Sequence, residues 1–295
     1  MRIIPALIAA FLSLAPAFAA EPTADPGPAI WQISDEDTTI YLMGTIHVLS
    51  PDIRWQSPAV ERVIAQSDVL VLESLADSEA ESAFARNLTR TTPDKALSDR
   101  IRPENRAILA DLAKEADIPL RRLDRMPVWL ASFMLVYGNS KADGISRSYG
   151  VETRLAEIFK SAGKPLDALE DSNTVVARLN GIAQAEQIAT LDAWLDQKRN
   201  GKLAAGEIAP EADVDKAWAQ GDLGPLEQAL SPDALGPAFY AILVVERNRA
   251  WADGVIARLA HPGTLLIAVG AAHLTGPDSL LRMLEARGVS VRRIS

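Results

Sequence analysis

The sequence predicts an α/β protein with a mixed, mostly parallel central sheet, built from two βαβ-like halves with a large helical insertion between them. The first observation is a strand–helix–strand pattern over residues 39–73, a length that suits a right-handed crossover between parallel strands. The second observation is a similar pattern over residues 264–294. The third is a helical periodicity over most of the chain between the two halves.

The N-terminal half is predicted to begin with a β-hairpin, because two apolar strand-like segments flank a polar turn. We expect the second strand to stop at Gly44, and a helix to follow in which Ser57 is the cap and Pro58 the first residue. A continuous apolar run then predicts a buried strand that ends at Glu73. The predicted elements are strands at 29–34 and 39–43, a helix at 57–65 and a strand at 68–72.

The helical insertion is predicted over about 76–160 and 174–260, on either side of a short strand at 165–169 that ends at Glu170. Pro237 begins a segment that we predict to be one long helix, reaching Leu259. The other expected helices lie near 79–89, 103–116, 127–137, 150–162, 174–198 and 212–220. The C-terminal half then follows as a strand at 264–269, a helix at 278–287 and a strand at 289–294.

The first 19 residues are predicted to be a secretory signal peptide. Arg2 precedes an uncharged, largely apolar run, and Ala17-Phe18-Ala19 fits the small-x-small rule for cleavage. Cleavage leaves a Pro- and Ala-rich tether at 20–29 and a single domain at 30–295. We therefore expect a periplasmic or secreted bacterial protein. The alternative is an uncleaved N-terminal anchor, although the apolar run is barely long enough to span a bilayer.

Charge and composition disfavour several classes of partner and site. The 295 residues include 30 Lys and Arg against 39 Asp and Glu, a net charge of −9, which disfavours nucleic acid and anionic membranes as partners. No later apolar run is long enough to span a bilayer, so no stable membrane insertion is expected after cleavage. The chain has no cysteine, which excludes disulfides and thiolate metal ligands. The oligomeric state is not predicted.

Two Gly-x-x-His turns, Gly44-Thr-Ile-His47 and Gly270-Ala-Ala-His273, are the main candidates for a functional site. Each follows a predicted strand, as do Glu73 and Glu170. Ligands of parallel sheets bind outside the carboxyl ends of the strands, so these four side chains should lie at one edge. Two imidazoles with a carboxylate can hold a divalent metal, or a histidine oriented by a carboxylate can act as a general base without one.

Several other polar residues have competing interpretations. His261 precedes the strand at 264–269 and is predicted to be a turn residue at the opposite edge of the sheet. Glu152 and Glu170 are either supporting carboxylates or ordinary acids at helix starts. By its pattern alone, Glu246-Arg247-Asn248 is an ordinary charged helix face. The sequence lacks the zinc-protease motif His-Glu-x-x-His, the nucleophile elbow Gly-x-Ser-x-Gly and the glycine motifs that bind phosphates and dinucleotides.

The ordered motifs resemble the TraB/GumN family, which is related to the Tiki proteases and more distantly to erythromycin esterases and ChaN-type haem-binding proteins. The resemblance extends over nearly the whole mature chain. It is carried by Tyr41-Leu-Met-Gly-Thr-Ile-His47, Asp68-Val-Leu-Val-Leu-Glu73, Tyr149-Gly-Val-Glu152, Leu166-Asp-Ala-Leu-Glu170, Glu246-Arg-Asn-Arg-Ala-Trp251 and Ala268-Val-Gly-Ala-Ala-His-Leu-Thr-Gly276.

The resemblance implies an exported metal-dependent hydrolase, peptidase-like, that acts on a peptide or small molecule. It implies that His47, Glu73 and His273 hold a divalent ion such as Mn²⁺ or Co²⁺. It further implies that Arg247 stabilises negative charge and that Asn248 lies with it at the site. Glu170, from its position after a predicted strand, is the candidate supporting catalytic carboxylate. The alternatives are a metal-free, esterase-like hydrolase with His47 as general base and a non-catalytic peptide-binding protein of the TraB type.

Overall fold

A computed structural model describes residues 27–75, 95–137, 146–201, 211–229 and 231–295. The predicted signal peptide, most of the predicted tether and the helix expected near 79–89 lie outside these residues. Within the described ranges, no helix combines the length and the apolar character needed to cross a membrane.

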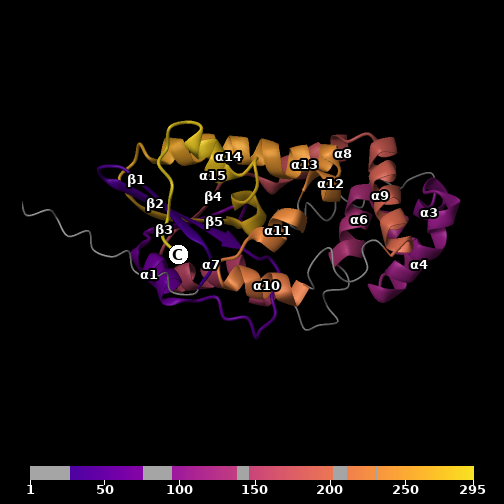
Figure 1. The fold of residues 1–295 in the computed structure, drawn as a ribbon, viewed down its shortest axis with the longest axis horizontal. Helices are drawn as coiled ribbons and strands as arrows, with labels where there is room; N and C mark the ends of the chain where they lie inside the picture. Colours follow the sequence, from indigo (N-terminus) through magenta and orange to yellow (C-terminus); the bar gives the residue numbers. More distant parts are fainter. Residues whose placement is uncertain (1–26, 76–94, 138–145, 202–210, 230) are drawn as a thin grey trace, which may run out of the picture.

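Six strands form one sheet in the order β4-β3-β5-β2-β1-β6, at the left of Figure 1. The strands are β1 (Ile30–Ser34), β2 (Thr38–Thr45), β3 (Val69–Leu72), β4 (Leu166–Ala168), β5 (Gly263–Gly270) and β6 (Arg292–Arg293). β2, β3, β4 and β5 are mutually parallel, and β1 runs antiparallel to both of its neighbours. The predicted mixed, mostly parallel α/β fold is confirmed. The two halves interleave, because β5 lies between β2 and β3.

The strands at the centre of the sheet are buried on both faces, as their continuous apolar sequences predict. One face packs against α1 (Pro58–Gln66), α7 (Val151–Ser161) and α10 (Glu211–Ala219), and the other against α14 (Glu246–Arg258) and α15 (Leu280–Glu285), as Figure 1 shows. Phe159 and Trp218 are fully buried on the first face, and Trp251 on the second. The sheet is thus the middle of three layers.

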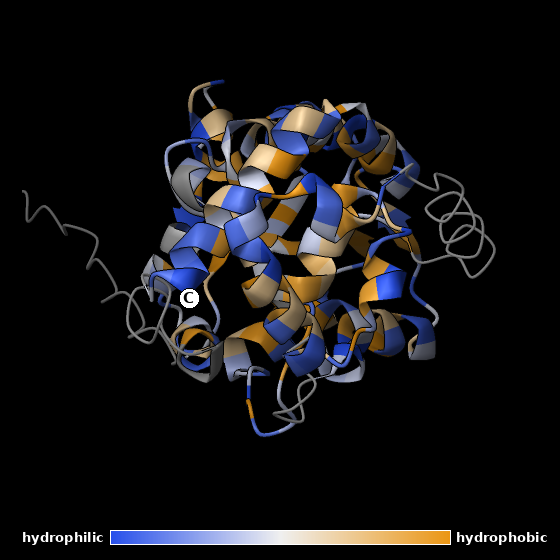
Figure 2. Cartoon of the chain, turned by 90° about the vertical axis from the view of Figure 1, so that its right-hand side faces the viewer, coloured by the Kyte–Doolittle hydropathy of each residue, from blue (hydrophilic) through white to orange (hydrophobic). Residues whose placement is uncertain are grey.

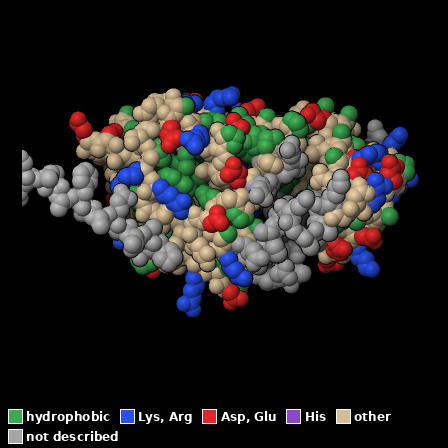
Figure 3. Space-filling view, viewed as in Figure 1, with side chains coloured by type: hydrophobic (Ala, Val, Ile, Leu, Met, Phe, Trp, Pro, Cys, Tyr) green, Lys and Arg blue, Asp and Glu red, His purple; other side chains and the backbone are tan. Residues whose placement is uncertain are grey.

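The helical insertion has an apolar core of its own, at the right of Figure 1 and facing the viewer in Figure 2. Leu109, Leu135 and Leu195 are buried in it. Its helices are α3 (Leu97–Arg100), α4 (Arg106–Glu115), α5 (Leu120–Leu123), α6 (Val128–Tyr137) and α9 (Gln184–Arg199). Between it and the sheet lie α8 (Ser172–Gly181), α11 (Gly224–Ala229), α12 (Pro232–Leu235) and α13 (Pro237–Tyr240). The face shown in Figure 3 carries acidic and basic side chains interspersed.

Four predicted boundaries were wrong. β2 continues past Gly44, because residues 38–45 pair in register with residues 263–270 of β5. The helix expected over 174–198 is two helices, since the buried side chain of Gln187 bonds the backbone carbonyl of Ile182 (2.8 Å) at the break. The helix expected over 237–259 is interrupted by a π-helix, η4 (Ala241–Val245). The strand expected over 289–294 is shorter, β6 (Arg292–Arg293), because just these two residues pair with β1.

Candidate functional site

The carboxyl ends of the parallel strands carry the predicted residues, at one edge of the sheet. His47 and Glu73 follow β2 and β3, and His273 lies in the short helix η5 (Ala271–Leu274) directly after β5. Gly270 is at the centre of this group. A Cβ atom on it would lie 3.1 Å from Oε1 of Glu73, 3.6 Å from Cδ2 of His273 and 3.7 Å from Nε2 of His47. The structure therefore brings the three side chains together around one glycine.

Glu73 is held as a buried, ionised carboxylate. The backbone N–H of Gly270 donates to its Oε1 (2.6 Å) and Nη2 of Arg247 to its Oε2 (2.5 Å). Burial opposes ionisation, but the charge of Arg247, the electrostatic effects of His273 and His47 and the Gly270 bond outweigh it and lower the pKa of Glu73 to about 2. The carboxylate is thus fixed at both oxygens.

Glu152 orients His47. Its Oε1 lies 2.7 Å from Nδ1 of His47 and accepts a hydrogen bond from the hydroxyl of Thr45 (2.5 Å). Glu152 is in the first turn of α7, and that helix starts unusually close to the His47 turn. A Cβ on Gly150 would lie 2.1 Å from the carbonyl oxygen of His47, so only glycine allows this approach. Glu152 is therefore a helix-start acid that also contacts His47, and its role as a supporting carboxylate stays a prediction.

The imidazole of His47 is exposed and positively charged at neutral pH. Partial removal of solvent by the surrounding protein lowers the pKa of the ring, but the hydrogen bond and the charge of Glu152, together with the charge of Glu73, raise the pKa to about 9. The side chain is 64% exposed, and with Nδ1 bonded to Glu152 its Nε2 is the nitrogen that approaches Gly270. His47 is accessible to solvent and has one nitrogen directed into the site.

His273 is buried and neutral. Its Nδ1 lies 2.7 Å from Oδ1 of Asn248, an amide oxygen that can only accept, so the proton is on Nδ1. Its Nε2 accepts a hydrogen bond from Nη1 of Arg247 (3.0 Å). Burial and the charge of Arg247 lower the pKa of His273 to about 3, although the charge of Glu73 opposes this. The two histidines of the repeated motif therefore carry different charges.

Arg247 links the site together. Its Nε and Nη2 donate to Oε1 of Glu170 (2.8 and 2.6 Å), Nη2 also bonds Glu73, and Nη1 bonds both His273 and the backbone oxygen of Leu243 (3.2 Å). Burial raises the pKa of Glu170 despite these bonds. The charged-helix-face interpretation was therefore wrong for Arg247, and likewise for its buried neighbour Asn248. The structure places Arg247 and Asn248 at the site, in contact with His273, as the resemblance implied.

A family model, described as the TraB/PrgY/gumN family, matches residues 29–293 and so covers every site residue. The chain belongs to the TraB/PrgY/gumN family. It is 26% identical over 250 residues to the protein YbaP of Escherichia coli (strain K12) and equally to that of Shigella flexneri, with 83% of this chain and 87% of each relative covered. No solved structure matches the chain. The wider relations to Tiki proteases, erythromycin esterases and ChaN-type proteins stay predictions.

Two residues at the site were missed as site residues in the sequence. Thr45 was assigned only to the turn, yet its hydroxyl bonds Glu152. Trp251 was named only as the last residue of a family motif, yet its indole N–H donates to Oε2 of Glu170 (3.3 Å) and its ring lies 4.5 Å from the guanidinium carbon of Arg247. The available signal was its spacing, because residues four apart share one face of a helix.

His261 lies where the sequence placed it, at the opposite edge of the sheet. It precedes β5, and its backbone oxygen accepts a hydrogen bond from the hydroxyl of Thr38 (2.9 Å). It shares no contact with the other two histidines among the interactions of the described residues.

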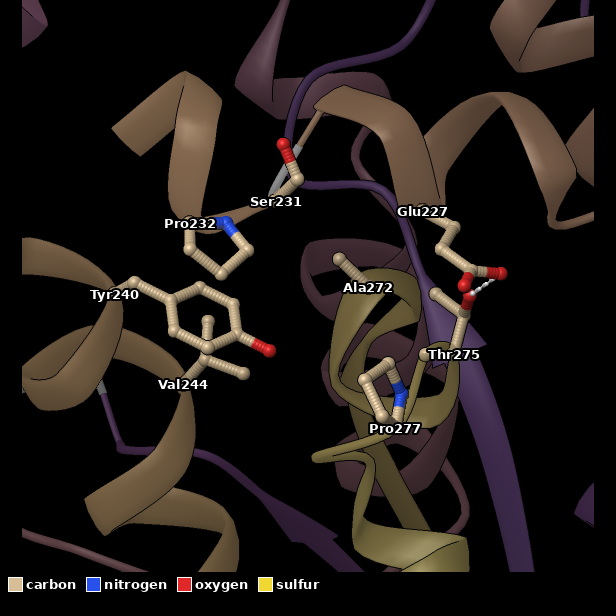
Figure 4. A pocket seen from close by; sticks show the side chains of 9 residues that line it. Glu227, Ser231, Pro232, Tyr240, Val244, Ala272, Thr275 and Pro277 are labelled. Carbon is tan, nitrogen blue, oxygen red and sulfur yellow. Dashed lines mark hydrogen bonds between the residues drawn. The ribbon is translucent and has the colours of Figure 1, made fainter. Parts of the chain in front are cut away.

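A cavity of about 90 Å³ lies beside the turn that carries His273 (Figure 4). Tyr240 and Val244 line one side of it and Ala272 and Pro277 another, as Figure 4 shows. The volume falls between the ~30 Å³ share of one water molecule and the ~150 Å³ of an apolar cavity that binds benzene. Glu227, Ser231 and Thr275 complete the lining, so the cavity has the size of a small aliphatic group and a lining that is mainly but not wholly apolar.

At the carboxyl edge of the sheet, some but not all of the nitrogen and oxygen atoms of His47, Glu73 and His273 are available to bind a divalent ion. The Nδ1 atom of each histidine is bonded to a neighbouring side chain, which leaves both Nε2 atoms for an ion. Nε2 of His273, however, accepts a hydrogen bond from Arg247. Among the residues that the structure describes, no three His, Asp or Glu side chains are arranged to hold a metal. With Arg247 in place the three predicted ligands do not fit one ion, and the Mn²⁺ or Co²⁺ site stays a prediction.

Proposed function

We propose that this chain is a hydrolase in which Nε2 of His47 activates a water molecule. The observation that carries the proposal is the pair formed by His47 and Glu152, in which the carboxylate fixes Nδ1 and leaves Nε2 beside Gly270, on a side chain that is 64% exposed. A histidine oriented by a carboxylate is the usual general base of hydrolytic sites that use one. Neutral His47 takes a proton from water, and Glu152 stabilises the imidazolium that forms.

The remaining residues supply charge and position. Arg247 is a fixed, buried positive charge beside Glu73 and His273. Its five N–H groups are all bonded to protein acceptors, so it stabilises negative charge that develops on a carbonyl oxygen through its charge and not through a direct hydrogen bond. Glu73 cannot move freely, because both of its oxygens are bonded, so it positions the water rather than attacking the substrate. Glu170 keeps the guanidinium in place.

The substrate class that the site favours is a peptide or another carboxylic acid derivative with a small aliphatic group. The cavity beside η5 is lined mainly by apolar groups, and Ala272 lines it one residue before His273. A substrate with an aliphatic side chain in this cavity would therefore lie next to the turn that carries His273.

The test is turnover of amide and ester substrates by protein treated with EDTA and then dialysed. We expect activity that the variant His47→Gln loses and the variant His261→Gln, altered at the exposed turn histidine, keeps. Loss of all activity with EDTA and its return with Mn²⁺ would show that an ion, and not His47 alone, activates the water. Tight peptide binding without turnover under either condition would favour the binding protein of the TraB type.

We also propose that the protein is exported through residues 1–19, whose charge and apolar run are typical of signal peptides. Sequencing the N-terminus of protein recovered from the periplasm is the direct test. A mature chain that begins at Ala20 supports cleavage after Ala19. A membrane-bound chain that still begins at residue 1 supports the anchor instead.

A further inference from the structure

The guanidinium of Arg247 bonds three acceptors whose chemical types also bind divalent cations. Oε2 of Glu73 lies 2.5 Å away, Oε1 of Glu170 2.6 Å and Nε2 of His273 3.0 Å. Two carboxylates and one imidazole are donors that divalent ions such as Mn²⁺ and Zn²⁺ accept in proteins. The side chain of Arg247 is 12% exposed, so solvent does not compete strongly for these bonds.

The hydrogen bonds also fix the direction of each acceptor. Asn248 holds the proton of His273 on Nδ1, so the lone pair of Nε2 is directed at Arg247. The carboxylates bring two negative charges against one positive charge. The ring of Trp251 lies under the guanidinium and prevents it from leaving on that side. The three acceptors are therefore directed at the guanidinium, Glu73 at Nη2, Glu170 at Nε and Nη2 and His273 at Nη1, and they can share one ion only if the guanidinium is removed and the side chains close on the space it leaves.

We propose that Arg247 is the permanent cation of this site and that it excludes a divalent ion from the acceptors Glu73, Glu170 and His273. This explains why His47, Glu73 and His273, the metal ligands implied by the resemblance, do not fit one ion. His273 and Glu73 are implied ligands, yet each already has the guanidinium as its partner. The inference deepens the proposed function and rests on it for the metal-free activation of water.

The experiment is a calorimetric titration of the full, EDTA-treated and dialysed protein with Mn²⁺ alone. Wild type is compared with Arg247→Met, and with Arg249→Met as the matched control, because Arg249 is an exposed arginine of the same helix. We expect Arg247→Met to bind Mn²⁺ at least tenfold more tightly than wild type and Arg249→Met. Equal affinity in all three proteins, or no binding by Arg247→Met, overturns the inference.

Two double variants identify the ligands. Arg247→Met/Glu170→Gln should lose the gain in Mn²⁺ affinity, whereas Arg247→Met/Glu152→Gln should keep it, because Glu152 contacts His47 and not this group. The opposite pattern overturns the assignment.

If Arg247→Met does not fold, wild type and His273→Gln decide the matter. Tight Mn²⁺ binding by wild type that His273→Gln abolishes overturns the inference, and weak binding by both supports it. Neither titration requires turnover, so its outcome is independent of whether the protein is a hydrolase.

Discussion

Replacing Glu152 by Gln should change the titration of His47 more than any other single substitution. The charge and hydrogen bond of Glu152 outweigh burial and hold the pKa of His47 near 9. Without the carboxylate we expect this pKa to fall toward its ordinary value of 6.5. At about 1.4 kcal/mol per pKa unit the difference corresponds to ~3 kcal/mol. Because 64% of the side chain is exposed, solvent screening reduces the contribution to ~1 kcal/mol.

The sign of the effect on stability follows from the raised pKa. A group with a folded-state pKa above its unfolded value stabilises the fold fully below about pH 6.5, and this contribution is lost as the pH rises through about 9. Wild type should therefore lose this stabilisation between neutral and alkaline pH, and Glu152→Gln should lack it throughout. In the proposed reaction neutral His47 is the active form, so activity should rise with pH in wild type and reach its plateau at lower pH in the variant.

The assay is an NMR titration of the ¹⁵N-labelled imidazoles in EDTA-treated protein, with pH–rate profiles beside it. Glu157→Gln is the matched control, since Glu157 lies on the same helix and pairs only with Arg154 at the surface. If His47 titrates at the same pH in wild type and Glu152→Gln, the reasoning that links Glu152 to His47 is refuted.

Three further substitutions test the close contacts. Gly270→Ala should lower activity at least tenfold with little change in melting temperature, because its Cβ would lie 3.1 Å from Glu73 while the backbone is not strained; a fully active variant contradicts this. Gly150→Ala should give unfolded or strongly destabilised protein, since its Cβ would lie 2.1 Å from a backbone oxygen of His47, and a normal melting curve refutes it. Lys164→Met should cost about 1–2 kcal/mol in urea unfolding, because the ammonium group donates to three carbonyls at the end of α1; an unchanged midpoint excludes that role.

The strands and the edge of the site could be predicted because they depend on local patterns. A continuous apolar run marks β5, and a charged or imidazole side chain directly after such a run marks the strand end. Strand order could not be predicted in this way. Nothing in residues 263–270 indicates that they pair with both β2 and β3, because that depends on the packing of the whole sheet.

The middle of the site was harder to predict than its edge. Arg247 and Asn248 lie on a helix with many charges, and a helical pattern shows which face is polar but not what that face contacts. The interruption of the helix at η4 also has no local signal, since Ala241–Val245 are all apolar. Trp251 is buried like a core residue, and its bond to Glu170 also makes it part of the site. That second role depends on the position of Glu170, which the sequence of the helix does not show.

The interleaving of the two halves decides when the site can form during synthesis. The bonds that fix Glu73 join residues 174 and 197 positions apart in the chain, to Arg247 and to Gly270. A nascent chain that ends before β5 has a gap in the middle of its sheet and lacks His273 altogether. Contacts of such long range also slow folding. The polypeptide therefore lacks the complete group of site residues until β5 and η5 have been synthesised.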